Sequence, residues 1–331
     1  ILALTLFSLS LSSAQQIKVA LCQMATTPDK AVNIATATAA IKVRRRREGV
    51  RDAPHKETHT FSRAHPFPSL SIFTQEAASN GAHLVVLPEI WNSPYDNAAF
   101  PVYAEDVEGG ASESATALAA AAAEAGVALV GGSIPERGAG GALFNSCLVF
   151  RPDGSLAAKH RKVHLFDIDI PGKITFKESD TLSPGPGPTV VDPGLGVLLG
   201  IGICYDLRFP ELASLSARRG AQVLVYPGAF NTTTGPAHWE LLLRARAVDN
   251  QCFVLACSPA RDEGGGGGYQ AWGHSTAVDP WGVVLAAAES SPAIVYAELD
   301  TGDCVTRRAN MPLAAQRRGD VYELVDKTAK G

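Results

Sequence analysis

The chain has 331 residues, of which 46% are hydrophobic, and its formal net charge at pH 7 is -4. This length and apolar content allow one large α/β domain or two ordinary ones, each with a substantial core. The acidic balance and the lack of a broad basic face exclude a typical nucleic-acid binder. The six cysteines form no CxxC pair and no zinc-type spacing, which favours a reducing compartment over a disulfide framework.

Residues 1–16 form an apolar, serine-rich leader. The leader is too short for a membrane span, and it resembles the end of a signal or transit segment. The alternative is untranslated or wrongly predicted sequence. We therefore expect a targeting-like or non-native leader. The expected location is the cytoplasm, or a mitochondrion or another organelle if the leader is used.

One segment interrupts the first predicted helix. A strand over 17–24 and a helix over 30–42 open the fold, but residues 43–75 carry an arginine run and show no apolar period. Removing 43–75 joins the helix to residues 76–81 as one continuous amphipathic helix. The segment keeps the reading frame and has intron-like limits, so one hypothesis is a retained intron. The other is a disordered surface loop whose arginines bind an acidic partner.

The rest of the chain alternates strand and helix patterns. The residues 172–196, rich in Gly and Pro, are expected to form a long irregular connection. The pattern predicts one domain over 17–325, followed by a tail over 326–331, with two mixed sheets covered by helices on the outside. The expected helices cover 111–126, 211–219 and 238–251, and the expected strands include 127–133, 221–227, 252–257 and 293–300.

Three strand ends carry groups suited to nucleophilic chemistry. The apolar run 196–203 ends on Cys204, and a helix opens at Pro210. Glu89 follows a Leu-Val-Val-Leu-Pro run, and Lys162 follows a strand-turn pattern. Folds of the α/β class place reactive groups at the carboxyl ends of strands. A carboxylate, an amine and a thiol together indicate acyl transfer at an amide.

Each of these residues has a simpler interpretation when taken alone. Cys204 is then a buried structural thiol, Glu89 a capping or surface carboxylate, and Lys162 one solvated charge. His160 and His164 stand four apart, but an arginine follows His160 where a zinc protease has glutamate. We therefore expect structural or supporting histidines and no metal. Only the combination of the three strand ends favours catalysis.

The surroundings of the three residues resemble the signatures of the nitrilase superfamily of carbon-nitrogen hydrolases, and most of all its omega-amidase branch. The resemblance runs from residue 17 to residue 323, leaving out 43–75. Beyond the three strand ends, it rests on the stretches 160–179, 226–239 and 246–251. These stretches are long, so the similarity is far more specific than a three-residue motif.

The resemblance implies an α-β-β-α sandwich that assembles as a homodimer. It also implies a triad of Glu89, Lys162 and Cys204, supported by Glu178, with no metal or organic cofactor. Glu89 then takes the proton of the Cys204 thiol, and the sulfur attacks the amide carbonyl. Lys162 and the backbone N–H of Tyr205 stabilise the oxyanion, ammonia leaves, and water hydrolyses the thioester.

The omega-amidase resemblance implies dicarboxylic acid monoamides as substrates, namely 2-oxoglutaramate and 2-oxosuccinamate. The expected partner is therefore a small amide, not a nucleic acid or a membrane. The distal carboxylate of such a substrate needs a cationic or multi-donor clamp. Arg208 is the nearest candidate in sequence, although an ion pair with a neighbouring carboxylate explains it equally well. Tyr95 and Thr233 or Thr234 are weaker candidates.

Several alternatives stay open. The deaminated-glutathione amidase branch shares the Cys-Tyr-Asp-Leu-Arg-Phe-Pro-Glu type of motif, but the residues 167–176 and 228–231 favour the omega-amidase branch. Nitrile hydrolysis is less favoured. A chain that carries 43–75 can also be an inactive or binding-only product. Finally, Cys204 can act as a redox sensor, since an activated thiol is oxidisable.

Overall fold

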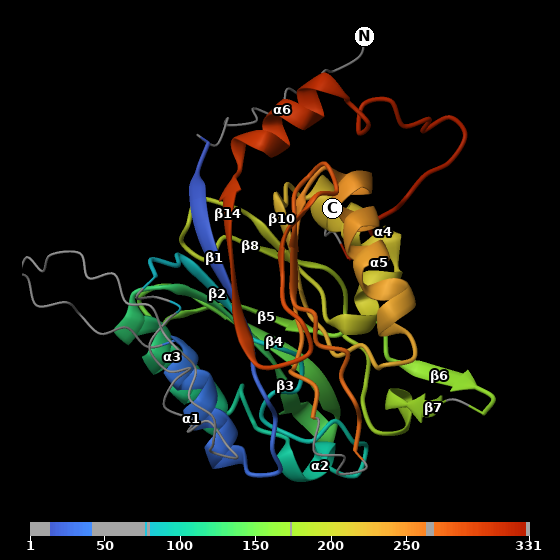
Figure 1. Cartoon of the computed structure of the whole chain (residues 1–331). Helices are drawn as coiled ribbons and strands as arrows, with labels where there is room; N and C mark the ends of the chain where they lie inside the picture. Colours follow the sequence, from blue (N-terminus) through green and yellow to red (C-terminus); the bar gives the residue numbers. More distant parts are fainter. Residues whose placement is uncertain (1–13, 42–76, 78–79, 173, 263–267, 329–331) are drawn as a thin grey trace, which may run out of the picture.

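The computed structural model describes residues 14–41, 77, 80–172, 174–262 and 268–328. Two six-stranded sheets pack face to face, and helices cover the outer side of each sheet (Figure 1). The predicted single-domain sandwich of two mixed sheets is therefore confirmed. The predicted insertion over 43–75 and residues 1–13 of the predicted leader lie outside the described residues.

The first sheet has the strand order β14-β1-β2-β3-β4-β5. Its strands β1, β2 and β3 are parallel, and antiparallel strands flank them on both sides. The helices α1 and α3 lie on its outer face (Figure 1). The bounds are β1 Gln16–Gln23, α1 Lys30–Ile41, β2 Leu84–Val86, α3 Glu113–Ala125, β3 Ala128–Arg137, β4 Leu143–Phe150, β5 Leu156–Arg161 and β14 Ala293–Asp300.

The second sheet repeats this plan, with the order β13-β12-β11-β10-β9-β8. Its strands β9, β10 and β11 are parallel, and the other strands pair antiparallel. The helices α4 and α5 cover its outer face (Figure 1). The bounds are β8 Thr189–Val191, β9 Leu199–Ile201, α4 Pro210–Arg218, β10 Val223–Pro227, α5 Gly235–Asn250, β11 Phe253–Cys257, β12 Thr276–Val278 and β13 Val284–Ala287.

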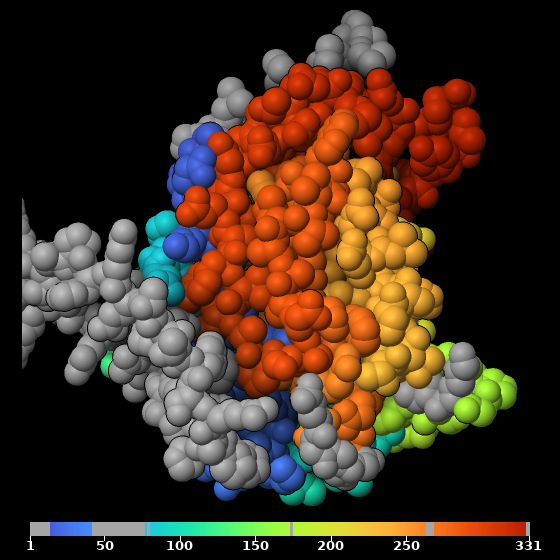
Figure 2. All heavy atoms as spheres, in the orientation of Figure 1, coloured from blue at the N-terminus to red at the C-terminus, as the bar shows by residue number. Residues whose placement is uncertain are grey.

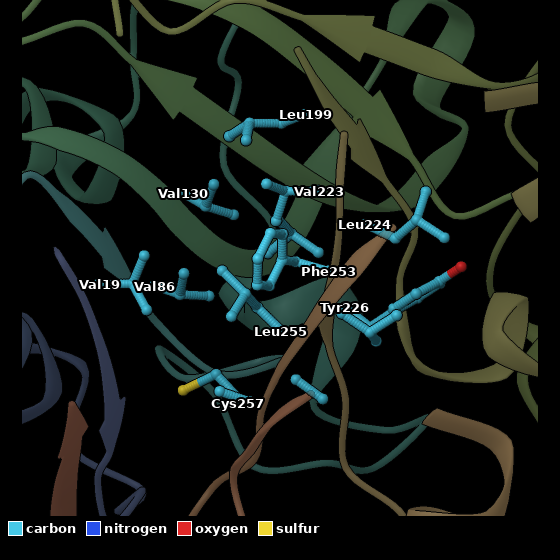
Figure 3. Close-up of a cluster of buried hydrophobic side chains, with 14 of the residues drawn as sticks. Val19, Val86, Val130, Leu199, Val223, Leu224, Tyr226, Phe253, Leu255 and Cys257 are labelled. Atoms are coloured by element: carbon cyan, nitrogen blue, oxygen red, sulfur yellow. The ribbon is translucent and has the colours of Figure 1, made fainter. Parts of the chain in front are cut away.

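The main core lies between the two sheets (Figure 3). Val19 and Val86 of the first sheet and Val223, Phe253 and Leu255 of the second are all at most 1% exposed. Each such side chain stabilises the fold by about 1.5–3 kcal/mol when it is fully buried. The parallel strands are apolar on both faces because one face meets the other sheet and the other face meets helices.

Local signals set the ends of the outer helices. Asp29 caps α1, as expected, since its side chain accepts a hydrogen bond from the backbone N–H of Val32 at 3.1 Å. Ser112 caps α3 in the same way through the N–H of Ala115 at 3.0 Å. α3 ends at Gly126, whose φ of 67° is left-handed and favours glycine.

The expectation of one long irregular connection over 172–196 is wrong. The chain there forms β7, the short 3₁₀ helix η3 and β8, because pairing with distant strands stabilises segments too short to show a period. The sequence pattern did not indicate several short elements, β7 and η3 among them. These are α2 Phe100–Tyr103, η2 Ala139–Gly141, β6 Asp167–Ile170, β7 Ile174–Lys177, η3 Glu178–Asp180, η4 Cys204–Arg208 and α6 Gly302–Asn310.

The end of the described chain packs on the domain. Asp326, in the predicted tail, pairs with Arg219 at an N–O distance of 2.5 Å. In the portion of the chain with described positions, no helix has the length and apolar character that a bilayer crossing requires.

Candidate active site

The two sheets bring three reactive side chains together. Glu89 follows β2 and Lys162 follows β5, so both come from the first sheet, whereas Cys204 follows β9 of the second. Glu89 and Lys162 are fully buried, and Cys204 is 3% exposed. The sequence placed each residue at a strand end, and the sandwich makes these ends meet.

Glu89 is the centre of the hydrogen-bond network. Its Oε1 accepts from Lys162 Nζ and from Asn145 Nδ2, each at 2.9 Å. Its Oε2 accepts from the backbone N–H of Ala229 at 2.8 Å. The Cys204 thiol lies close enough to this carboxylate that each group shifts the pKa of the other. The carboxylate is therefore fixed in position near the thiol.

Lys162 lies between two carboxylates. Its Nζ is 2.9 Å from Glu178 as well as 2.9 Å from Glu89. Glu178 is also fully buried, and it accepts from the Tyr95 hydroxyl at 2.7 Å and from the backbone N–H of Phe166 at 2.6 Å. The two carboxylates thereby hold the ammonium group between them.

Burial and charge shift the pKa values of these groups in defined directions. Burial raises the pKa of Glu89, although Lys162 opposes this. Burial alone would lower the pKa of Lys162, but Glu178 and Glu89 outweigh it and raise this pKa. Burial and the Glu89 charge raise the pKa of the Cys204 thiol. The thiol is therefore protonated at neutral pH and needs a base before it can attack a carbonyl.

The backbone at the thiol is strained. Cys204 has a φ of 46°, a left-handed conformation that costs about 1–3 kcal/mol in a residue other than glycine. Ile90, directly after Glu89, has a φ of 48°. A sharp turn after a strand projects its side chain from the sheet edge, as in the nucleophile turns of other hydrolases. Gly228 keeps room for this turn, since a Cβ there would lie 3.2 Å from the Cα of Cys204.

A cavity of about 630 Å³ opens beside Glu89. Its walls are loops that follow the carboxyl ends of β1, β2, β10 and β11, so both sheets contribute. This volume is in the range of small-molecule sites. In the described part of the chain, no cluster of three or more His, Cys, Asp or Glu residues is placed to hold a metal ion.

A buried thiol near a carboxylate and an ammonium group, beside such a cavity, is suited to amide hydrolysis. The model of the family described as Carbon-nitrogen hydrolase matches residues 18–309. The chain belongs to this family. It is an amide-hydrolysing carbon-nitrogen hydrolase of the nitrilase superfamily, and it is similar to proteins described as omega-amidases.

Its relatives in this family are found in plants, animals and fungi. The chain is 60% identical to the chloroplastic omega-amidase of Arabidopsis thaliana over 254 residues, covering 76% of this chain and 68% of the relative. It is 55% identical to omega-amidase NIT2 of Mus musculus over 253 residues, covering 76% and 89%. The crystal structure of Saccharomyces cerevisiae Nit3 superposes with a TM-score of 0.74 at 42% identity, covering 92% and 97%.

The residues predicted to bind the substrate lie in different places in this carbon-nitrogen hydrolase. Tyr95 lies within the carboxylate cluster, with its hydroxyl 3.3 Å from Glu89 Oε1. Arg208 lies over the rings of Phe230 and Tyr205, and its Nη1 is 3.1 Å from His238 Nδ1. Within the described residues, Arg208 forms no ion pair.

Thr234 lies at the start of α5, where its N–H and its hydroxyl both donate to Asn231 Oδ1. Thr233 donates its N–H to the same oxygen at 3.0 Å. Neither threonine contacts the carboxylate cluster. The proposed roles of Arg208 and Thr234 therefore stay predictions.

Three further contributors were not predicted from the sequence. Asn145 is a buried amide inside the mostly apolar strand β4, and this polar position was a usable signal. The Ala229 N–H carries no signal because every residue has a backbone amide. Tyr269 stacks on Tyr95 with ring centroids 4.5 Å apart, although 174 positions separate the two residues in sequence.

Proposed function

We propose that this carbon-nitrogen hydrolase is an omega-amidase. It hydrolyses dicarboxylic acid monoamides such as 2-oxoglutaramate and 2-oxosuccinamate to the 2-oxo acid and ammonia. The observation that supports this most is the buried cluster in which Lys162 bridges Glu89 and Glu178 near the Cys204 thiol, whose pKa Glu89 raises. The similarity to proteins described as omega-amidases supports the substrate class.

In the first half of the reaction, Glu89 takes the thiol proton as the Cys204 sulfur attacks the amide carbon. The carbonyl oxygen becomes an oxyanion, which the Lys162 ammonium and the Tyr205 N–H stabilise, each by about 3 kcal/mol. The protonated Glu89 then gives its proton to the leaving nitrogen. The C–N bond breaks, ammonia departs, and a thioester to Cys204 remains.

In the second half, Glu89 takes a proton from water, and the resulting hydroxide attacks the thioester. The same two donors stabilise the second oxyanion, the C–S bond breaks to release the acid, and Glu89 returns its proton to the Cys204 sulfur. Glu178 and Tyr95 keep the Lys162 ammonium in place throughout, because both contact it. The reaction consumes one water and returns the thiol to its starting form.

Mass spectrometry of the trapped acyl-enzyme tests this proposal. The intact chain, mixed with monoamide and acid-quenched, is expected to gain the mass of the acyl group on the peptide that contains Cys204. Cys204→Ala abolishes the adduct. Lys162→Ala lowers kcat by about 10²–10³-fold, as expected for one oxyanion donor. Glu89→Gln also abolishes turnover, since the amide keeps the shape but cannot take a proton.

Two readouts distinguish the alternatives. Faster formation of 2-oxoglutarate from deaminated glutathione, whose leaving group is cysteinylglycine, than from 2-oxoglutaramate would favour the deaminated-glutathione amidase. An intact chain that folds, as judged by circular dichroism, but forms no 2-oxoglutarate from either substrate would favour a binding-only protein. Near-normal turnover of any of the three variants would exclude the assigned role of that residue.

A further inference from the structure

The cavity beside the triad contains a cation that the proposed chemistry does not use. Of the described residues that line it, Arg261 alone carries a positive charge. Arg261 follows β11 of the second sheet, at the same edge of the sandwich as the triad. Of the reactive cluster, Glu89 and Tyr95 line the same cavity, so Arg261 and the Glu89 carboxylate border one space.

Arg261 is held rigidly. Its Nε donates to the carbonyl of Ala271 at 3.3 Å, and its Nη2 donates to the carbonyl of Trp272 at 3.0 Å. The guanidinium carbon lies 4.9 Å from the centroid of the Trp272 ring, over its face. Among the described residues, Arg261 forms no ion pair with a carboxylate, and its Nη1 has no hydrogen-bond partner. One end of the fork is therefore left for a ligand.

A second donor in the same wall is also unused. The Thr26 hydroxyl lies in the loop after β1 and is buried, yet it has no hydrogen-bond partner within the described part of the chain. An unpartnered buried polar group costs free energy unless a ligand or water satisfies it. Thr26 and Arg261 thus offer a neutral and a charged donor to one cavity.

Charge balance explains why an anionic substrate needs such donors. The reactive cluster contains one ammonium group, Lys162, and two carboxylates, Glu89 and Glu178. When all three are ionised, their net charge is -1, which repels a second negative group on the substrate. Lys162 already pairs with both of these carboxylates. A separate cation is therefore suited to hold the distal carboxylate.

We propose that Arg261, assisted by the Thr26 hydroxyl, binds the distal carboxylate of the monoamide. This inference rests on the proposed amidase function and names the residues that select its substrate class. Asp262, also in the cavity wall, is exposed and already takes part in an interaction of its own. The proposal gives the specificity role to Arg261 and not to Arg208, which does not line the cavity among the described residues.

A matched pair of substrates tests the proposal. Glutaramate carries the distal carboxylate, and pentanamide has the same chain length without it. Arg261→Gln is expected to raise KM for glutaramate by about 10- to 100-fold, the effect of losing one charge-assisted hydrogen bond. The kcat/KM for pentanamide should stay within about twofold, because uniform binding of the amide end is untouched. Arg261→Lys should recover part of the loss.

Two more variants sharpen the result. Thr26→Val is expected to raise KM for glutaramate by about 3- to 10-fold, as for one neutral hydrogen bond. Arg318→Gln changes an exposed arginine that pairs with Asp320, and it should change KM for neither substrate. Equal losses on both substrates for Arg261→Gln would mean a structural role. A selective loss for Arg208→Gln without one for Arg261→Gln would move the clamp to Arg208. Either result overturns the proposal.

A binding measurement separates this inference from the amidase proposal. Glutarate, titrated into the intact wild-type chain by calorimetry, is expected to bind at least about tenfold more tightly than into Arg261→Gln. This difference supports the carboxylate subsite even if the wild type releases no ammonia, in which case only the amidase proposal fails. Turnover of glutaramate with equal glutarate affinity in both proteins would overturn the subsite alone.

Discussion

Glu89 accepts several hydrogen bonds, yet its environment still favours the protonated form. Donors to the ionised carboxylate lower its pKa, whereas full burial and the nearby Glu178 raise it, and burial dominates. This balance suits a group that must take a proton from a thiol and later give it to nitrogen. At the residue scale, the pKa of Glu89 therefore depends on the number of hydrogen-bond donors to its carboxylate.

The pH dependence of kcat/KM tests this balance. Glu89 must be ionised to act as a base, so activity falls as the pH drops through its raised pKa, and the midpoint lies above the ordinary value of 4.5. Asn145→Ala removes a donor to the ionised form and is expected to move the midpoint to higher pH. Asn310→Ala, at an exposed position, is the control. An unchanged or lower midpoint for Asn145→Ala would contradict this account.

At the scale of elements, Asp206 joins the two segments that carry the thiol and the lysine. The fully buried carboxylate accepts from the backbone N–H groups of Ile203 and His164, each at 2.9 Å, and lies 2.7 Å from His164 Nδ1. Ile203 directly precedes Cys204, and His164 lies two residues after Lys162. One side chain thus fixes the turn after β9 against the end of β5.

Asp206→Asn tests this connection. The variant is expected to lower the free energy of unfolding at pH 7 by about 2–4 kcal/mol, since buried hydrogen bonds to a charged group are lost. Burial would raise the pKa of Asp206, but hydrogen bonds from His160 and His164 outweigh it and lower this pKa. The stability contributed by this group is therefore present above its unfolded value near 3.8 and is lost as the pH falls through the folded pKa.

Urea unfolding across this pH range measures the effect. The difference between wild type and Asp206→Asn should shrink on acidification, and kcat should fall at pH 7 because the thiol and the ammonium lose their alignment. Asp180→Asn, at an exposed position, is the matched control. A pH-independent difference, or full kcat in Asp206→Asn, would show that Asp206 does not position the two segments.

At the scale of the whole molecule, the described residues that precede and follow the predicted insertion pack in the same part of the core. Ile41 at the end of α1 and Ala77 belong to the same buried cluster. The N–H of Ala82 donates to the carbonyl of Ala77 at 3.3 Å, and Gly81 has a φ of 77°. This combination is typical of a helix C-terminus. It supports our proposal that one helix is interrupted by 43–75.

Deletion of 43–75 is therefore expected to leave a folded enzyme. It removes the entropic cost of closing a long loop, so the free energy of unfolding should rise by up to about 3 kcal/mol. Ammonia release should be equal to that of the full chain or higher. Thermal unfolding and the ammonia assay on both chains measure this. An unfolded or inactive deletion variant would show that the segment belongs to the working protein.

We propose that the predicted homodimer forms through an interface over α5 and the β12–β13 hairpin. Figure 2 shows the gold α5 region beside the orange hairpin region on one face. The two are in contact, since Arg244 Nε donates to the Gly282 carbonyl at 2.8 Å. Large apolar side chains on these elements are exposed, namely Leu241 and Val248 on α5 and Trp281, Val283 and Leu285 in the hairpin.

Light scattering tests this surface. The wild type is expected to have the mass of two chains, and Trp281→Glu combined with Leu241→Glu should give the mass of one, because a buried charge opposes association. Val102→Glu, at a 76% exposed apolar position on α2, should leave the mass unchanged. A wild type that is monomeric at micromolar concentration would exclude the proposal, as would a dimeric double variant.

The strands and the three candidate reactive residues show most clearly what could be predicted from the sequence. Long apolar runs and turn residues indicated β1, β10, β11 and β14, because those signals are local. Short elements such as β7 and β8 were missed because distant pairing stabilises them. Glu89, Lys162 and Cys204 could each be placed at a strand end, and a carboxylate, an amine and a thiol limit the chemistry that they can perform.

The sequence alone therefore determined the layers of the fold and the reactive groups, since both follow from local periodicity and residue type. Only the tertiary structure decided which groups surround them. The packing of the two sheets places Asn145, the Ala229 N–H and Tyr269 around the thiol and its base, and it puts Arg261 in the cavity and Arg208 elsewhere. Contacts between residues far apart along the chain arise from packing, which no local pattern encodes.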